Sequence, residues 1–381
     1  MIELYNNKEN CCGCTACENS CPKNAIVMKA DEEGFLYPAI DAERCIECKA
    51  CLKVCPFKNE LINNISKAYA VKNKNENIRM TSSSGGIFTV ISDYILEREG
   101  TIYGAVFNNE FGVYHSRAIN KADREAMKGS KYLQSDLKDT YFNIKKDLQE
   151  GKYVLFTGTS CQTAGLYNFI PKNLDCSKLY VCDIICHGAP SPLMWNEYIR
   201  FLKKKYSSEI NSINFKDKES SWHYPQLKIK MNKLTYKARH DEDDYLKLFF
   251  DHYILRPSCH NCKFTNLQRQ SDITMADFWG IEDCNPEFDD DKGISFVLIN
   301  TDKGKRIFND ISEELIFTEV NIEDGMKKQP SLISPPWRNS RRGEFWRDYN
   351  KKGFVYILKK YRGHGFKAKL KKKIKLFLNK I

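Results

Sequence analysis

The sequence predicts a mixed α/β protein, of the α+β or α/β class, in which a small N-terminal module precedes a larger domain with a β insertion. Three observations support this fold class. Two similar cysteine runs lie near the N-terminus, strand-like and helix-like segments alternate from residue 67, and residues 210–240 have the alternating apolar pattern of antiparallel strands. We divide the chain into residues 1–60, 66–150, 151–330 and 331–381.

The N-terminal module contains two copies of the pattern Cys-x2-Cys-x2-Cys-x3-Cys-Pro, if Cys12 is left out of the first copy. This spacing is typical of bacterial ferredoxins with two [4Fe–4S] clusters, in which the fourth cysteine of each run binds the cluster of the other run. The sequence therefore predicts two clusters with these thiolate ligands: Cys11, Cys14, Cys17 and Cys55 for one, and Cys45, Cys48, Cys51 and Cys21 for the other.

Zinc and disulfide bonds are the alternatives for these cysteines. Structural zinc usually takes two separated cysteine pairs, and two closed runs of four cysteines fit that arrangement poorly. Disulfides form in oxidising compartments, and residues 1–10 lack the apolar core of a signal peptide. No apolar run approaches the length of a bilayer span. With 16 cysteines, the chain is expected in a reducing cytoplasm.

The net charge of +11 comes from the C-terminal tail. Residues 351–381 carry 12 Lys or Arg and no acidic residue, which leaves 48 basic and 49 acidic residues in the body. The body is therefore not expected to bind nucleic acid. Four apolar residues of the tail recur at helical spacing: Leu370, Ile374, Phe377 and Ile381. This helix either docks on the protein, or binds an acidic partner or the inner face of an anionic membrane.

The larger domain is predicted element by element from apolar runs, helical periodicity and turn residues. Strands are expected over 67–72, 101–107, 113–118, 153–156, 179–185, 272–278, 294–300 and 315–319. Helices are expected from residue 87, over 138–149, 190–206 and 244–255, and from residue 302. Asn108-Asn109 suits the turn of a hairpin, and residues 61–66 suit a linker.

Two loops of small residues suit ligand binding. The loop Ser84-Gly85-Gly86 precedes a helix, and a helix N-terminus reached through such a loop suits a phosphate. A plain capped helix is the alternative, because the loop has neither the Walker nor the Rossmann spacing. Residues 157–162 follow a buried strand, at the kind of position where open α/β sheets bind ligands.

Four cysteines beyond the module are candidates for a third cluster. Cys161 and Cys186 follow two predicted parallel strands, and Cys259 and Cys262 form a Cys-x2-Cys pair. If the two strands are neighbours, all four thiolates can converge at one edge of the sheet. Alternatively, the first two are apolar fillers and the pair binds zinc or nothing. The remaining cysteines are expected to be structural: Cys12, Cys176, Cys182 and Cys284.

Six short motifs occur in one order between residues 66 and 330. They are Ser83-Ser84-Gly85-Gly86, Lys128-Gly129-Ser130-Lys131-Tyr132, Thr157-Gly158-Thr159-Ser160-Cys161-Gln162, Cys186-His187-Gly188-Ala189-Pro190-Ser191, Arg256-Pro257-Ser258-Cys259-His260-Asn261-Cys262 and Ser271-Asp272-Ile273-Thr274-Met275-Ala276-Asp277-Phe278-Trp279-Gly280. Together they resemble the coenzyme F420 hydrogenase/dehydrogenase β-subunit family, in the bacterial form with an N-terminal ferredoxin module. Ser160 stands where Pro is common, and Ala276 where Gly is common. Residues 66–150 and 151–330 resemble the family's N-terminal and C-terminal regions.

The resemblance implies an FAD beside one further [4Fe–4S] cluster in a flavin and iron–sulfur domain. The cluster ligands would be Cys161, Cys186, Cys259 and Cys262, and the FAD-binding residues Ser84, Gly85, Gly86, Lys131, Gly158 and Thr159. Lys131 would stabilise the anionic reduced flavin, unless it is an ordinary loop lysine. His187 would relay a proton or donate to a sulfur, unless it is a packed histidine. These two are the catalytic candidates.

The function implied is that of an oxidoreductase which moves electrons between ferredoxin-type clusters and FAD, and on to an organic two-electron substrate. The alternatives are an electron-transfer subunit with no substrate site, which acts only with a partner enzyme, and a zinc-bound interaction module. The expected partners are a ferredoxin-like redox protein or a partner enzyme, and no nucleic acid. Archaeal relatives use coenzyme F420 and other relatives use other organic substrates, so the resemblance identifies no substrate.

Overall fold

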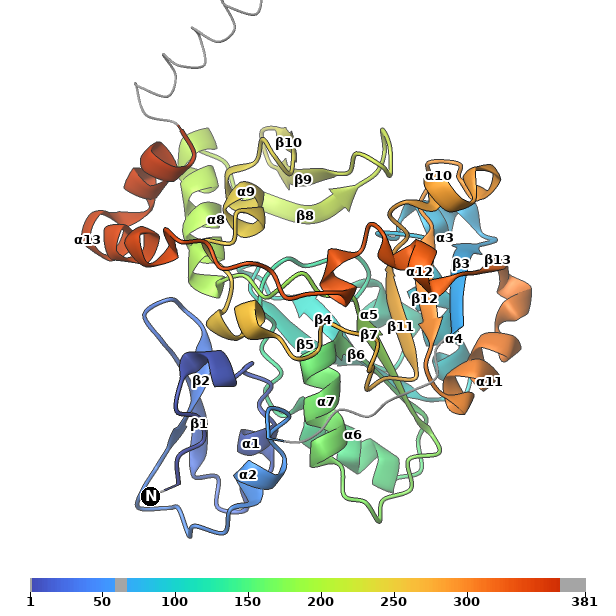
Figure 1. Cartoon of the computed structure of the whole chain (residues 1–381), viewed down its shortest axis with the longest axis horizontal. Helices are drawn as coiled ribbons and strands as arrows, with labels where there is room; N and C mark the ends of the chain where they lie inside the picture. Colours follow the sequence, from blue (N-terminus) through green and yellow to red (C-terminus); the bar gives the residue numbers. More distant parts are fainter. Residues whose placement is uncertain (1, 59–66, 364–381) are drawn as a thin grey trace, which may run out of the picture.

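The computed structural model describes residues 2–58 and 67–363 of the 381-residue chain. It has the mixed α/β class that the sequence predicts, with a small N-terminal module beside a larger domain (Figure 1). The predicted linker at 61–66 and the tail helix with Leu370, Ile374, Phe377 and Ile381 lie outside the described residues.

The N-terminal module is built from two similar halves. Its elements are the 3-10 helix η1 (Lys8–Asn10), the helices α1 (Ala16–Asn19) and α2 (Ala50–Lys53), and the strands β1 (Ile26–Ala30) and β2 (Leu36–Ile40). Thr15 and Lys49 occupy the same place in the two cysteine runs, and both have left-handed backbone, with φ of 61° and 62°. Each run therefore turns in the same way before its short helix. The turn between β1 and β2 is closed by a hydrogen bond from the Gly34 amide to the Asp31 carbonyl at 2.9 Å.

One mixed sheet of eight strands organises the larger domain. The strands are β3 (Lys67–Asn73), β4 (Thr101–Phe107), β5 (Val113–Ala118), β6 (Val154–Thr159), β7 (Leu179–Ile184), β11 (Ile273–Asp277), β12 (Ser295–Ile299) and β13 (Leu315–Val320). Their order is β13-β3-β12-β11-β7-β6-β4-β5. The central pairs β4/β6, β6/β7 and β7/β11 are parallel, and the outer pairs are antiparallel.

Helices cover both faces of this sheet. The α-helices of this part of the chain are α3 (Glu76–Met80), α4 (Ile87–Leu96), α5 (Lys121–Glu125), α6 (Thr140–Gln149), α7 (Ser160–Phe169), α10 (Ile281–Cys284), α11 (Asp302–Asp310) and α12 (Ile322–Met326). Leu155 packs into one core with α4, whereas its neighbours Val154 and Phe156 pack with α6 and α7 on the opposite face. This alternation along β6 is what the pleat of a strand requires when both faces are buried.

A second, smaller sheet forms the predicted β insertion. Its strands are β8 (Ile210–Asp217), β9 (Gln226–Met231) and β10 (Thr235–Arg239), in the order β10-β9-β8. It shares one apolar core with α8 (Pro192–Tyr206), α9 (Asp244–Phe250) and α13 (Arg342–Tyr361), at the top of Figure 1. The remaining short 3-10 helices are η2 (Pro257–Asn261), η3 (Pro286–Phe288), η4 (Ser312–Glu314) and η5 (Pro330–Leu332).

Two local predictions differ from the structure. The loop expected over residues 157–162 is absent, because β6 continues through Thr159 and α7 starts at Ser160. A capping box explains the sharp start: Thr159 caps the helix, and the Gln162 side chain accepts from the Thr159 amide at 2.9 Å. The helix expected over 244–255 ends at Phe250, and His252 then has a left-handed backbone with φ of 60°.

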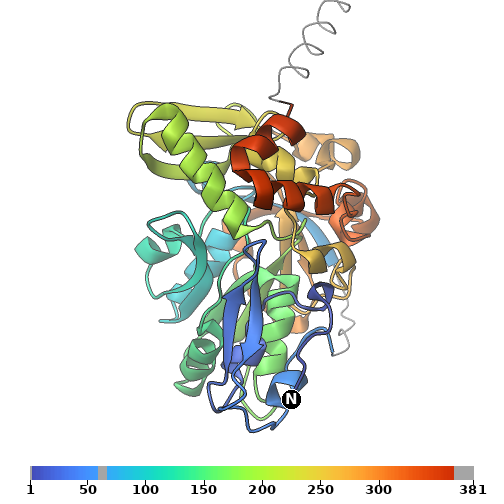
Figure 2. The same ribbon diagram turned by 90° about the vertical axis from the view of Figure 1, so that its left-hand side faces the viewer.

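The N-terminal module packs against α6, α7 and α8 of the larger domain (Figures 1 and 2). Its β1–β2 turn touches α8 so closely that a Cβ on Gly34 would lie 2.4 Å from the Leu193 Cβ. The Asn19 side chain donates to the Lys138 carbonyl at 2.8 Å and accepts from the Phe142 amide at 3.1 Å. These contacts fix the cysteine runs relative to the large sheet.

A buried ion pair ties the module to the C-terminal helix. Arg342 in α13 donates to both carboxylate oxygens of Glu33, with Nη1 to Oε1 at 2.8 Å, and the two side chains are 6% and 12% exposed. Burial raises the pKa of the Glu33 carboxyl, and Arg342 opposes that shift. The pair therefore depends on both partners being present. Within the described residues, no helix is long and apolar enough to cross a membrane.

We predict that Glu33→Ala destabilises the protein by about 3 kcal/mol, because it leaves the Arg342 guanidinium buried without its counter-ion. Chemical denaturation measures the change in the free energy of unfolding. The double variant Glu33→Met/Arg342→Met should recover most of the loss, since two apolar groups need no partner. The matched control is Glu9→Ala, which removes the partner of the more exposed Arg338 and should change stability by less than about 1 kcal/mol. Equal effects of Glu33→Ala and Glu9→Ala would contradict the prediction.

Candidate functional site

The first predicted ligand set lies inside the contact between the module and the larger domain, and we call its place the inner site. Burial raises the pKa of the Cys17 thiol, and the neighbouring Cys11 and Cys55 raise it further. Cys14 in turn interacts with Cys17 and Cys11. Backbone amides of Gly13 and Glu18 point at sulfurs of this set and stabilise their thiolate forms. Amide donors to sulfur are one of the means by which proteins tune iron–sulfur clusters.

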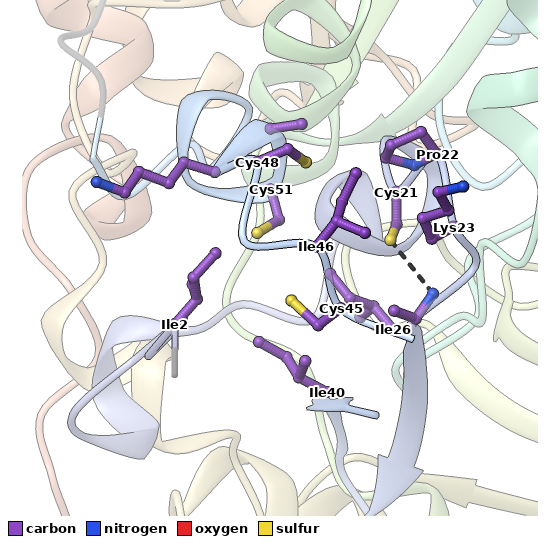
Figure 3. Close-up of a pocket in the computed structure, with 13 residues that line it drawn as sticks. Ile2, Cys21, Pro22, Lys23, Ile26, Ile40, Cys45, Ile46, Cys48 and Cys51 are labelled. Atoms are coloured by element: carbon purple, nitrogen blue, oxygen red, sulfur yellow. Dashed lines mark hydrogen bonds between the residues drawn. The ribbon is translucent and has the colours of Figure 1, made fainter. Parts of the chain in front are cut away.

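The second predicted ligand set lies at the surface, and we call its place the outer site. Its four cysteines line one cavity together with apolar side chains (Figure 3): Cys21, Cys45, Cys48 and Cys51. The Ala25 amide donates to the Cys21 sulfur at 3.2 Å. Cys48 is exposed, and 58% of the neighbouring Ile46 is exposed. An electron carrier in solution can therefore approach this site.

The four cysteines of the third predicted site lie together at one edge of the large sheet. β6 and β7 are parallel neighbours, so Cys161, in the first turn of α7, and Cys186, just after β7, lie at the same edge of the sheet. Burial raises the pKa of Cys186, and the nearby thiols of Cys259, Cys161 and Cys262 raise it further. Burial likewise raises the pKa of Cys259 to about 12 and that of Cys262 to about 11. The Ala189 amide donates to the Cys259 sulfur at 3.3 Å.

The spacing of these thiols differs from that of a four-cysteine zinc site. Four thiolates around zinc, at about 2.3 Å from the metal, lie within about 4 Å of one another. Among the described residues, no set of three cysteines has its sulfur atoms all within 4.8 Å of one another. These thiols are buried, interact electrostatically and accept hydrogen bonds from backbone amides. Such surroundings are typical of the thiolate ligands of a [4Fe–4S] cluster.

Cys12 joins the inner site to the third site. Its thiol interacts with Cys14, which raises the pKa of Cys12, and with Cys161, which lowers it. The helix α7 is the second point of contact, since a Cβ on Gly165 would lie 3.0 Å from the Cys14 sulfur. The sequence predicts only a structural role for Cys12, and nothing in its spacing indicates this place between two ligand sets. Cys182 does lie in an apolar core, as expected.

A polar cavity of about 240 Å³ opens beside the loop that was predicted to bind FAD. Its charged lining residues are Glu125, Lys128, Lys131 and Lys216, and its hydroxyl donors are Thr81, Ser82, Ser83 and Ser130. Burial lowers the pKa of Lys131 to about 7, and its Nζ donates to the carbonyls of Met127, Lys128 and Gly129. These donors and charges fit the pyrophosphate of FAD, because phosphate oxygens accept hydrogen bonds and carry negative charge.

The other predicted FAD-binding residues have different surroundings. A Cβ on Gly85 would lie 2.1 Å from the Val71 carbonyl oxygen, so this glycine is required by packing on the sheet rather than by a ligand. Gly86 has φ of 88° and caps α4, and the Ser84 carbonyl accepts from Lys218 at 2.7 Å. Gly158 and Thr159 lie at the cysteines instead, where the Thr159 hydroxyl is 3.2 Å from the Cys161 sulfur.

His187, the second catalytic candidate, packs against other rings. Its Nε2 lies 2.9 Å from Nε2 of His252, and its ring contacts Phe249 and Phe250 edge-on. His252 Nδ1 donates to the Trp337 carbonyl at 2.8 Å, so both ring nitrogens of His252 have a partner. Burial lowers the pKa of His187 to about 4, which keeps the imidazole neutral. This geometry favours the packed alternative over a proton relay.

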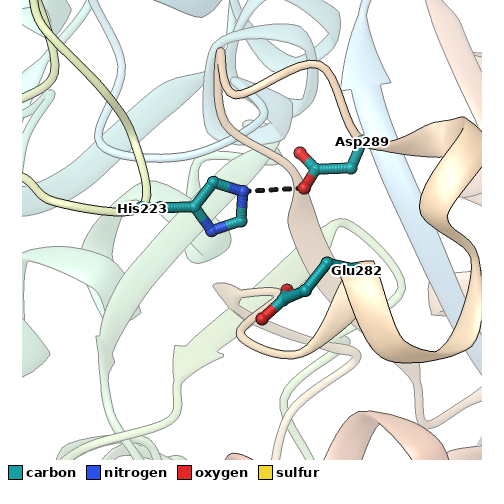
Figure 4. A group of neighbouring side chains, drawn as sticks. All are labelled: His223, Glu282 and Asp289. Atoms are coloured by element: carbon teal, nitrogen blue, oxygen red, sulfur yellow. Dashed lines mark hydrogen bonds and ion pairs between the residues drawn. The ribbon is translucent and has the colours of Figure 1, made fainter.

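A group of possible metal ligands lies away from the cysteines, at His223, Glu282 and Asp289 (Figure 4). His223 Nε2 is 2.7 Å from Asp289 Oδ2, and Glu282 pairs with Lys328 at 2.8 Å. Each side chain thus has a partner, and the His223 contact joins the β insertion to the loop before β12. We assign this group a structural role.

Comparisons with known proteins match the two parts separately. The family profile for the C-terminal region of the coenzyme F420 hydrogenase/dehydrogenase β subunit matches residues 151–325. Two profiles described as "4Fe-4S dicluster domain" match residues 10–59 and 37–85. An uncharacterized ferredoxin of Methanocaldococcus jannaschii is 36% identical over 75 residues, which are 20% of this chain and 96% of that protein.

One further relative and one solved structure also match. A ferredoxin-like protein in the nif region of Sinorhizobium fredii is 40% identical over 53 residues, which are 12% of this chain and 75% of that protein. Among solved structures, a chain of the F420-reducing [NiFe] hydrogenase complex from Methanosarcina barkeri matches with 17% identity and a TM-score of 0.47. That match covers 81% of this chain and 95% of the other.

We predict that the affinity of the cavity for FAD falls as the pH rises above about 7, because Lys131 then loses its charge in the free protein. Bound phosphate raises the pKa of Lys131. Between the pKa of Lys131 in the free protein and its higher pKa in the complex, each rise of one pH unit weakens binding about tenfold. Titration of flavin fluorescence at pH 6, 7, 8 and 9 measures this slope. Lys131→Arg stays charged and is the control, with an affinity that should change little over this range. Equal slopes in both proteins would refute a role for Lys131.

Proposed function

Because the chain belongs to the coenzyme F420 hydrogenase/dehydrogenase β-subunit family and carries a dicluster [4Fe–4S] domain, we propose that it is a flavin-linked iron–sulfur oxidoreductase. In this proposal it exchanges single electrons with a redox protein and electron pairs with an organic substrate. The observation that carries the proposal is the convergence of Cys161, Cys186, Cys259 and Cys262 beside the inner site. A chain that transferred electrons through the two module clusters alone would not need these four thiols where the larger domain contacts the module.

The order of the three sites supports one electron route. The outer site has an exposed cysteine, the inner site faces the larger domain, and Cys12 connects the inner site with Cys161. Lys131 lines the cavity, and three residues later the same segment lies at the cysteines. There the Gln134 side chain donates to the Cys12 carbonyl at 3.4 Å. We propose that electrons follow this sequence of sites between the surface and the cavity.

The balance of the proposed reaction follows from the cofactor types. In the reducing direction, two molecules of a reduced one-electron carrier each give up one electron, and both leave oxidised. The organic acceptor takes up these two electrons and two protons from solvent. FAD supplies the change between one-electron and two-electron chemistry. Ser83, Ser130 and Lys131 would hold its pyrophosphate.

We predict about 12 iron atoms per chain in anaerobically purified protein, since each of three [4Fe–4S] clusters contributes four. Cys161→Ala and Cys259→Ala should each lose about four of these and keep the other eight. Iron and acid-labile sulfide assays measure the loss. Cys176→Ala is the control, because its thiol is half-buried and bonded to the Leu174 carbonyl, away from all three sites. Unchanged iron in both site variants would exclude the third cluster.

A second test concerns the flavin. We predict that the purified protein releases about one FAD per chain on denaturation, and that a reduced ferredoxin reduces this flavin through the clusters. Stopped-flow spectroscopy should find flavin reduction in Cys161→Ala at least about tenfold slower, while the module clusters are reduced at the wild-type rate. A protein that holds three clusters but neither contains nor binds FAD would instead be an electron-transfer subunit without a substrate site.

A further inference from the structure

One buried cation lies between the inner site and the third site. Arg256 is 1% exposed and precedes the Cys259–Cys262 pair in the chain. Its side chain points away from this pair, toward the first cysteine run of the module. The Cys259 amide donates to the Arg256 carbonyl at 2.9 Å, so the backbone of the same residue belongs to the third site. Arg256 thus touches both ligand sets.

Every nitrogen of the Arg256 guanidinium has a partner. Nε donates to the Cys11 carbonyl at 2.8 Å, and Nη2 donates to the Leu36 carbonyl at 3.0 Å and lies 3.7 Å from the Cys11 sulfur. Nη1 donates to Gln134 Oε1 at 3.0 Å. The Tyr37 ring covers one face, with its centroid 4.1 Å from the guanidinium carbon. These contacts hold a fixed positive charge against a predicted cluster ligand.

The chain makes room for this contact. Gly13 has φ of 70°, and a Cβ there would lie 3.0 Å from Arg256 Nη1 and 2.6 Å from Gln134 Nε2. Glycine at this position thus suits both the positive φ and the close approach of the guanidinium to the cysteine loop. Lysine could supply the charge at this place, but its single ammonium cannot reach the three directions that the planar guanidinium serves.

The outer site has no comparable buried cation among the described residues that line its cavity. Its lining lysines, Lys23 and Lys49, are exposed, so water screens their charges. At the inner site the guanidinium is buried, and its interaction with a cluster is much less screened. Reduction adds one negative charge to a [4Fe–4S] cluster, and a nearby fixed positive charge favours that step. Arg256 should therefore raise the reduction potential of the inner cluster, with no matching effect at the outer cluster.

We propose that Arg256 raises the reduction potential of the inner cluster, and so favours the transfer of electrons from the outer cluster toward the third site. Arg256 is a positioning residue, which acts on the cluster through Cys11 and not on a substrate. The inference rests on the proposed function only for the destination of the electrons. The effect of Arg256 on the potential of the inner cluster depends only on the module and its contact with Arg256.

The test is a redox titration of the full-length protein followed by electron paramagnetic resonance, with Arg256→Gln, Arg256→Lys and wild type. Arg256→Gln should make reduction of the inner cluster at least about tenfold less favourable, which is a shift of about 59 mV to lower potential for one electron. The outer cluster is the internal reference and should not move. Arg256→Lys keeps the charge and should restore most of the wild-type potential.

Arg338→Gln is the matched control, because this guanidinium also pairs with the module, at Glu9, but is 55% exposed and touches no cysteine. It should leave both potentials unchanged. Loss of the inner cluster in Arg256→Gln alone, with Arg256→Lys near wild type, also supports a need for the charge. Equal shifts of both clusters, no shift in Arg256→Gln, or an equal defect in Arg256→Lys would overturn the inference. A wild type with two clusters and no third would refute the proposed function but leave this result intact.

Discussion

The parallel pairing of β6 with β7 is the constraint on which the rest of the site depends. In a parallel pair the carboxyl ends of both strands lie at one edge, and here each strand is followed by a cysteine, Cys161 or Cys186. The β insertion and α9 then return the chain to the same edge with Cys259 and Cys262. Four thiols from three segments meet because the sheet has this order, not because they are close in sequence.

The site also depends on how the N-terminal module docks on the larger domain. Two buried guanidinium groups form part of that contact. Arg342 binds the β1–β2 turn through Glu33, and Arg256 binds the first cysteine loop. A guanidinium suits such a junction because it keeps its charge when buried and presents donors in several directions. The module is thereby oriented with its inner site toward the larger domain and its outer site toward solvent. A different orientation would separate Cys14 from Cys161, which Cys12 now joins.

Much of this arrangement could be predicted from the sequence, but the contacts between the module and the larger domain could not. Cysteine spacing identified the module, and apolar periodicity placed nearly all the strands, including the hairpin of β4 with β5. The third ligand set needed the additional assumption that β6 and β7 are neighbours. Cys12 and Arg256 could not be recognised, because their roles arise from contacts over more than 100 positions along the chain, for which a single sequence has no pattern. The glycines 85 and 86 were expected at a ligand, whereas Gly85 is required by packing on the sheet.

The lining of the cavity bears on the proposal that the larger domain binds an anionic cofactor there. Three lysines and several hydroxyl groups line it, against the single carboxylate of Glu125. Lys216 is held by Asp277, and Lys131 by backbone carbonyls alone, so only Lys131 combines burial with no acidic partner in its hydrogen bonds. A buried ammonium without a counter-ion is electrostatically costly, and an anionic ligand relieves that cost when it binds. The electrostatic cost that the loop around Lys131 imposes therefore supports the proposal that this cavity binds an anion.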